Sequence, residues 1–162
     1  MAETIQRVDY YYIYTPDKPG EGARALAALK EARVNLLAFS GFPQGRRAQL
    51  VFVPADSAAF TAAAKKAKWK VSKKKTAFLI QGDDRPGALV DIVGKLAASK
   101  INVTAVDAVS TGAGRFGAIL WVKAASVKRA AKVLGVVEAP APITVPPSGG
   151  QEMGGEVGYK RW

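Results

Sequence analysis

Cysteine and histidine are both absent from the 162-residue sequence. Without cysteine the chain has no disulfide, no thiolate metal site and no cysteine nucleophile. Without histidine it lacks the commonest general base and the commonest metal ligand. No spacing of serine, lysine or carboxylate residues suggests another catalytic arrangement. The sequence therefore predicts a protein that is not an enzyme, has no catalytic residues, uses no cofactor and holds no metal ion.

Long apolar runs and a secretory leader are also missing. No uncharged apolar stretch reaches the roughly 18 to 20 residues that a membrane span needs. Residues 1–7 lack the basic flank and apolar run of a secretory signal. We therefore expect a soluble, cytoplasmic protein with no membrane partner.

Acidic residues are scarce, and none lies between Asp56 and Asp83. The net charge is +11, and seven lysines fall in that interval: Lys65, Lys66, Lys68, Lys70, Lys73, Lys74 and Lys75. Cations are favoured at a helix C-terminus, and lysine on an edge strand discourages pairing with another chain. We expect a solvated basic face here. The alternative is docking to an acidic enzyme or to nucleic acid.

The sequence contains an internal repeat. Asp17-Lys-Pro-Gly20 matches Asp84-Arg-Pro-Gly87 at an offset of 67 residues, and the same offset relates Asn35 to Asn102. A constant offset over this span favours two copies of one structural unit.

Each half has one order of predicted elements: strand, helix, strand, strand, helix, strand. Alternating and helical apolar periods define them, with Leu26 and Leu29 as core candidates of the first helix and Ser57 as the N-cap of the second. A two-residue length change in the intervening turn aligns residues 50–53 with 119–122. The elements are expected at 10–14, 22–33, 35–40, 48–54, 57–68 and 69–71 in the first half, and at 77–81, 89–97, 102–110, 117–123, 124–134 and 136–139 in the second.

This order is the ferredoxin-like βαββαβ arrangement. We predict an α+β fold of two such modules, at residues 8–72 and 76–139, with antiparallel sheets and helices on one face. The Pro/Gly-rich residues 140–162 are expected to be extended or disordered. The second face of each sheet needs a cover, so we expect the chain to pack against itself or to form a homodimer.

Both halves resemble the ACT domain family at two landmarks. These are the Asp-x-Pro-Gly turn after the first strand and the Val/Ile-Asn pair after the first helix. The resemblance implies regulatory modules that bind amino acids or related small molecules where two modules meet. It also implies a partner enzyme that responds to the effector.

The chemistry of the motif agrees with an amino-acid ligand. Glycine lets the backbone approach a ligand, and amides at a helix N-terminus stabilise a carboxylate. The aspartate would receive the ligand's ammonium, and the asparagine can donate to and accept from its polar groups. A cap for the aspartate and a helix stop for the asparagine are the structural alternatives. The predicted ligand-binding set is Asp17, Gly20, Asn35, Asp84, Gly87 and Asn102, with the better site in the second half.

Two other functions fit the sequence less well. Tyr10, Tyr12 and Tyr14 alternate onto one face of a strand, and with Phe52 and Trp121 they would make a nucleic-acid-binding sheet platform. The third strands lack the Gly-Phe-x-Phe pattern of such platforms, which disfavours nucleic acid. The remaining alternative is a structural protein whose sheet face serves only dimerisation or assembly.

Overall fold

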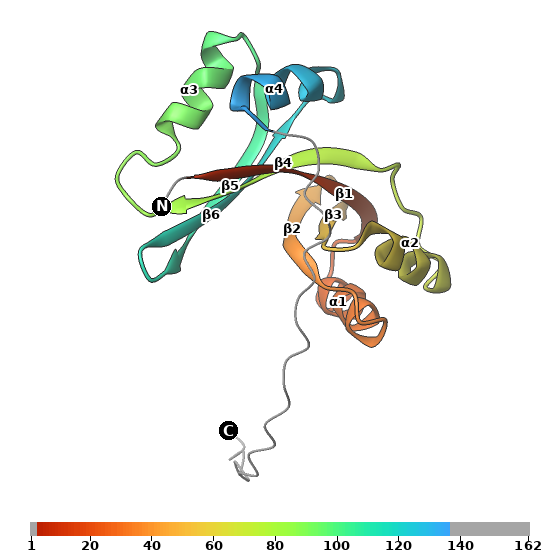
Figure 1. Ribbon diagram of the computed structural model, residues 1–162. Coiled ribbons are helices and arrows are strands. Elements are labelled where there is room, and N and C mark those ends of the chain that lie inside the picture. Colours follow the sequence, from red (N-terminus) through yellow and green to blue (C-terminus); the bar gives the residue numbers. More distant parts are fainter. Residues whose placement is uncertain (1–2, 137–162) are drawn as a thin grey trace.

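The computed structural model describes residues 3–136 (Figure 1). The predicted tail at 140–162, and all but the first residue of the predicted strand 136–139, lie outside this range. The described elements are β1 (Thr4–Pro16), α1 (Glu21–Glu31), β2 (Leu36–Gln44), β3 (Arg47–Pro54), α2 (Ser57–Lys66), β4 (Lys75–Asp83), α3 (Val90–Ala98), β5 (Val103–Gly112), β6 (Arg115–Val122), a short 3-10 helix η1 (Ala124–Ser126) and α4 (Val127–Leu134).

The strands form one antiparallel sheet in the order β2-β3-β1-β4-β6-β5. Each half contains strand, helix, strand, strand, helix, as the repeat predicted. The predicted α+β, ferredoxin-like fold class is confirmed. Within residues 3–136, no helix is long and apolar enough to cross a membrane.

Strand β1 belongs to both halves. Its first part, from Thr4 to Tyr10, pairs with β4, and its second part, from Tyr11 to Pro16, pairs with β3. The first half thus supplies an outer strand to the sheet of the second half. No local pattern in the sequence specifies this long-range pairing.

The predicted strand at residues 69–71 is wrong. This segment has no regular strand pairing. Just after it, the Ser72 N–H donates to the Tyr12 carbonyl at 2.9 Å, and the Tyr12 N–H donates to Ser72 Oγ at 3.0 Å. Because the hydroxyl replaces a backbone acceptor, the chain follows β1 without forming a ladder until β4 begins.

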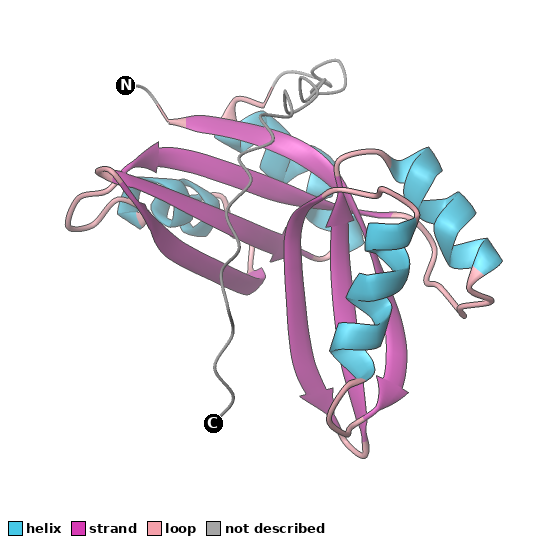
Figure 2. Cartoon of the chain, turned by 90° about the horizontal axis from the view of Figure 1, so that it is seen from below, coloured by secondary structure: helices cyan, strands magenta, loops and turns pink. Residues whose placement is uncertain are grey.

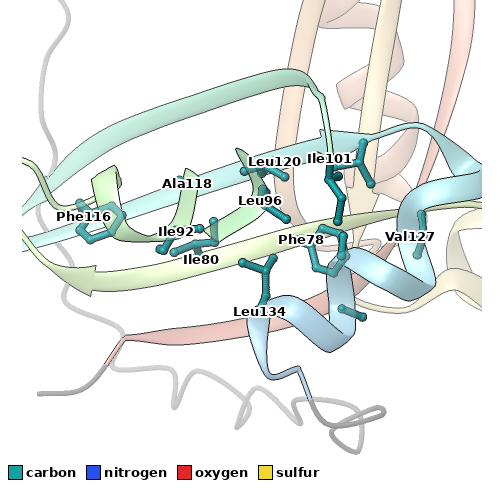
Figure 3. Close-up of a cluster of buried hydrophobic side chains, with 13 residues drawn as sticks. Phe78, Ile80, Ile92, Leu96, Ile101, Phe116, Ala118, Leu120, Val127 and Leu134 are labelled. Atoms are coloured by element: carbon teal, nitrogen blue, oxygen red, sulfur yellow. The ribbon is translucent and has the colours of Figure 1, made fainter. Parts of the chain in front are cut away.

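The helices cover the outer face of the sheet, α1 and α2 over the first half and α3 and α4 over the second (Figure 2). In the second core, Ile92 and Leu96 of α3 and Leu134 of α4 pack over Phe78 and Leu120 (Figure 3). Their four-residue spacing places Ile92 and Leu96 on one helix face.

The first core is smaller than the second, and Ala25 takes the buried position of α1 for which the sequence suggested Leu26. Ala25 and Leu29 of α1 are buried against the sheet, whereas Leu26 is 38% exposed. The prediction of Leu26 as a core residue was therefore wrong. Positions 25 and 29 lie one helical turn apart, so the buried stripe of α1 runs through the smaller side chain.

A third core fills the inner, helix-free face, on which the sheet curls. It contains Val51 and Val53 of β3 together with Ile119 and Trp121 of β6. The two halves thus cover each other's sheet face within one chain. The face from which a homodimer was predicted is therefore covered within the chain at β1, β3, β4 and β6, whereas β5 stays exposed from Thr104 to Gly112.

The strand registers correct the alignment of the third strands by one residue. Phe39 and Val106 are equivalent at the 67-residue offset, and they pair with Phe52 and Leu120. Phe52 therefore corresponds to Leu120, not to Trp121 as the sequence alignment suggested. A bulge near the end of β5 adds one residue, where two had been inferred.

The ends of the helices correct one predicted cap and place three basic residues in a left-handed conformation. The N-cap of α2 is Asp56, whose carboxylate accepts from the Ala59 N–H at 3.0 Å; Ser57 instead donates to Asp9 at 2.7 Å. Each of α1 to α4 is followed by a residue with positive φ, in chain order Arg33, Lys68, Lys100 and Gly135. Three of these left-handed stops, a conformation that favours glycine, are basic residues.

Candidate ligand-binding site

The two Asp-x-Pro-Gly turns have the backbone conformation that their glycines suggest. Gly20 has a φ of 92° and is the N-cap of α1, and Gly87 has a φ of 77° just ahead of α3. At Gly20 no described atom beyond its chain neighbours lies within 4 Å of where a β-carbon would stand. The backbone here is open to an approaching ligand.

Neither aspartate caps the helix that follows it. No side chain accepts from the first amides of α1 or of α3. The structural alternative of a capping aspartate is therefore wrong for both Asp17 and Asp84. The uncapped N-terminus of α1 offers backbone donors and a positive dipole end to an anion. At α3 the Ala88 and Val90 N–H groups already donate to carbonyls of the preceding turn, which leaves fewer free donors.

The two aspartates have different surroundings. Asp84 Oδ2 accepts from Ser110 Oγ at 2.7 Å, and its N–H donates to the Gly114 carbonyl at 2.8 Å. These bonds tie the second turn to the β5–β6 hairpin. The Asp17 side chain has no hydrogen bond or ion pair within residues 3–136. The uncommitted carboxylate is thus in the first half, whereas the sequence favoured the second.

The two asparagines lie far from the turns of their own halves. Asn35 and Asn102 are exposed and precede β2 and β5, after the C-termini of α1 and α3. A helix of 11 residues is roughly 16 Å long, which separates Gly20 from Asn35. Neither asparagine is the helix stop, because Arg33 and Lys100 take the left-handed position. In neither half does the structure gather the predicted residues into one compact set.

A groove of about 960 Å³ lies between the halves. The end of β2 contributes Phe42 and Gln44, and the start of β5 contributes Thr104 and Ala105. None of the six predicted ligand-binding residues lines it. Asn102 is two positions before Thr104, a lining residue. Asp17 follows Pro16, which pairs with Arg47; Arg47 in turn pairs with the lining residue Gln44. Asn102 is thus close in sequence to the groove lining, whereas Asp17 is related to it through the strand pairing at Gln44.

The groove is strongly basic. Its lining includes six cationic side chains: Arg7, Lys73, Lys74, Lys75, Lys123 and Lys128. Among the described residues, no aspartate or glutamate lines it. A negatively charged ligand is attracted more strongly into such a basic concavity than to an open basic surface.

Aromatic rings form the rest of its distinctive lining. Tyr10 meets Trp121 edge to face, with ring centres 6.3 Å apart, and Lys75 Nζ lies 5.3 Å from the centre of the Tyr12 ring. Burial, and then the neighbouring Tyr12, raise the pKa of Tyr10 above its ordinary value. Tyr10 is therefore a neutral phenol at neutral pH.

Comparison with known proteins shows the fold. No family model and no curated protein matches the sequence. Protein BT0572 from Bacteroides thetaiotaomicron superposes with a TM-score of 0.71 at 17% identity, over 81% of this chain and 88% of that one. The regulatory subunit of aspartate kinase from Thermus thermophilus, in its ligand-free form, gives 0.58 at 16% identity, over 83% and 96%. The corresponding subunit from Thermus flavus gives 0.53 at 18%, over 83% and 94%. The chain has the tandem ACT-like fold.

Two of the five residues of the aromatic platform considered from the sequence are buried. Phe52 is fully buried in the first core, and Trp121 is buried in the core between the halves. These rings therefore do not form one open sheet face on which a run of bases could stack.

The sequence pointed to several groove residues but gave them other roles. Tyr10 and Tyr12 were considered as a platform, and Lys73 to Lys75 as an edge strand and linker. In the ACT-like fold Lys75 begins β4, which lies between β1 and β6 and is not an edge. One sequence signal could have indicated the groove. Tyr10 and Tyr12 alternate onto one face of β1, and the lysine-rich segment joins this strand where Tyr10 pairs with Lys75.

Proposed function

We propose that this tandem ACT-like chain is a non-catalytic regulatory protein that binds an amino acid or a close analogue and acts on a partner enzyme. The observation that carries the proposal is the pair of equivalent turns, each with a left-handed glycine, an aspartate and an uncapped helix N-terminus. The ACT resemblance read from the sequence, and the regulatory subunits among the structural neighbours, support the same role.

The chemistry of an α-amino acid fits these turns. Its carboxylate would accept from amides at the start of α1 or α3, beside Gly20 or Gly87. Its ammonium would bind Asp17 in the first turn or Asp84 in the second. Asp17 is the better candidate because its carboxylate has no partner within residues 3–136, whereas Asp84 already accepts from Ser110.

The asparagines would contribute across the interface between halves. Because the end of β2 and the start of β5 line one groove, Asn102 is the expected partner of Asp17. By the repeat, Asn35 would serve Asp84. A ligand held in this way would touch both halves, and a partner enzyme would respond to their relative position. We expect this chain to bind both the effector and the partner enzyme in the cytoplasm.

A thermal-shift screen of the twenty amino acids tests this function. A ligand at about one hundred times its dissociation constant stabilises the folded chain by about 2.7 kcal/mol. We expect one amino acid or a small group to raise the melting temperature of the parent. Asp17→Ala and Asn102→Ala should abolish the rise, and Asp84→Ala should reduce it if both turns bind.

Glu31→Ala is the matched control, because it removes one exposed carboxylate at the far end of α1. It should leave the ligand-induced shift unchanged. An absence of any shift across the screen, or equal loss in the control, would contradict the proposal.

A further inference from the structure

The groove between the halves is a poor match for a free amino acid. An α-amino acid carries an ammonium group, which needs an acceptor of negative charge. The described lining contains six cations and no carboxylate, with Gln44 and Gln49 as its amide side chains. The groove therefore favours a ligand with net negative charge, which distinguishes it from the turns at Asp17 and Asp84.

The position of the cations indicates more than one negative group. Lys73, Lys74 and Lys75 enter from the segment that begins β4, whereas Lys123 and Lys128 enter from the segment after β6. Of these, Lys75 is engaged with the faces of Tyr10 and Tyr12, at 6.0 and 5.3 Å. The other four are exposed and available to an anion.

The aromatic lining indicates a planar part in the same ligand. Phe42 is 38% exposed and lines the groove on the inner face, so its ring is the main aromatic surface open to a ligand there. Tyr12 also lines the groove, with Lys75 over its ring, and Trp121 is buried. Flat rings stack on aromatic side chains, and the base of a nucleotide does so whatever its identity. An inorganic anion would leave this apolar surface uncovered.

The volume agrees with one small molecule. About 960 Å³ is within the range of roughly 300 to 1,000 Å³ that ligand pockets span. We propose that the groove binds a nucleoside phosphate, with its base against the exposed ring of Phe42 and its phosphates against Lys73, Lys74, Lys123 and Lys128. This site is additional to the amino-acid site and is tested with different ligands.

Isothermal titration of the full chain with ADP tests the proposal. We expect saturable binding that weakens as salt rises from about 50 to about 300 mM, because phosphate–lysine attraction is screened. Pyrophosphate, which lacks the base, should bind at least about tenfold more weakly, the equivalent of one lost base–aromatic stack. Adenosine, which lacks the phosphates, should also bind at least about tenfold more weakly, the equivalent of one lost charge-assisted hydrogen bond.

Two pairs of variants test whether binding depends on the groove itself. One pair controls for general positive charge, and the other controls for the loss of any aromatic ring from β2. Lys73→Gln with Lys74→Gln should weaken ADP at least about tenfold, whereas Lys65→Gln with Lys66→Gln, outside the groove, should change it less than about twofold. Phe42→Leu should weaken ADP, whereas Phe39→Leu, exposed to the same degree at 37% but on the opposite face of β2, should not. Circular dichroism melts confirm that each variant folds.

Three results would overturn the proposal. The first is no heat of binding with ADP up to about 5 mM, a concentration that detects even millimolar affinity. The second is pyrophosphate binding as tightly as ADP, since the rings would then play no part. The third is a short single-stranded oligonucleotide binding about a hundredfold more tightly than ADP, which would assign the groove to a polymer.

Discussion

Ser40 and Asp107 occupy equivalent positions in the two halves and meet each other, with Ser40 Oγ 3.4 Å from Asp107 Oδ2. They lie 67 residues apart on β2 and β5, the two outermost strands of the sheet. The sheet therefore curls until its opposite edges touch, and the pair marks where the halves come together around their shared core.

This polar pair should contribute much less than the apolar core behind it. An exposed hydrogen bond of this length contributes at most about 1 kcal/mol, so Asp107→Ala should lower the free energy of unfolding by less than that. Leu79→Ala, in the core between the halves, should lower it by roughly 2 to 5 kcal/mol. Urea unfolding measures both, and equal losses would contradict this account of the interface.

The sharing of β1 predicts that the two halves unfold together. Phe60→Ala in the first core and Leu96→Ala in the second remove fully buried side chains, and each should destabilise by roughly 2 to 5 kcal/mol. Because β1 pairs with both β3 and β4, each variant should shift one common transition. Circular dichroism and tryptophan fluorescence followed in parallel would reveal two separate transitions if the halves were independent.

The repeat and its element order could be predicted because they depend on local signals. Turn glycines, apolar periods and the 67-residue offset all lie within short windows of sequence. The pairing of Thr4–Tyr10 with β4 could not, because a strand pattern says which faces are apolar but not which distant strand lies beside it. Residues 69–71 were predicted as a strand for the same reason, but no neighbouring strand pairs with them.

The groove was missed for a related reason. Phe42, Thr104 and Trp121 lie on three different strands, and they become neighbours only when the sheet curls. The alternation of Tyr10 and Tyr12 showed that they share a face, but it did not say that the other half of the same chain covers that face. Which of two faces is solvated depends on tertiary packing, not on the period of one strand.

Two glycines in the second half should respond to alanine in opposite directions. A β-carbon at Gly82 would stand 2.7 Å from Phe116 Cε1 and 2.9 Å from Glu3 Cγ, so Gly82→Ala should destabilise by roughly 1 to 3 kcal/mol. At Gly94, inside α3, no described atom outside the helix backbone lies within 4 Å, and Gly94→Ala should stabilise by roughly 0.5 to 1 kcal/mol. Thermal melts compare them directly. A higher melting temperature with Gly82→Ala would contradict the packing described at Gly82, and a lower one with Gly94→Ala would contradict the open space at Gly94.

The left-handed stop after α3 offers a stabilising substitution. Lys100 has a φ of 55°, a conformation that costs a residue with a β-carbon roughly 1 to 2 kcal/mol relative to glycine. Lys100→Gly should relieve this cost. The gain is reduced by the greater flexibility of glycine in the unfolded chain, roughly 0.4 to 1 kcal/mol, which leaves a net stabilisation of roughly 0 to 1.6 kcal/mol.

Lys100→Ala is the matched control for that substitution, because it removes the charge but keeps the β-carbon. It should give no gain in chemical unfolding. If alanine and glycine stabilise equally, the effect comes from the lost charge and not from the backbone.

The raised pKa of Tyr10 predicts how stability changes in alkali. Burial in the groove, and then the neighbouring Tyr12, disfavour the phenolate, so the folded chain holds this proton more tightly than the unfolded chain does. The resulting stability is fully present below the unfolded pKa, near 10, and is lost as pH rises through the higher folded pKa. Tyr10→Phe removes the titrating group, so its stability should fall less steeply than that of the parent above a pH of about 10. Melts across this range would test it, and parallel curves for parent and variant would show that Tyr10 titrates as an ordinary exposed tyrosine.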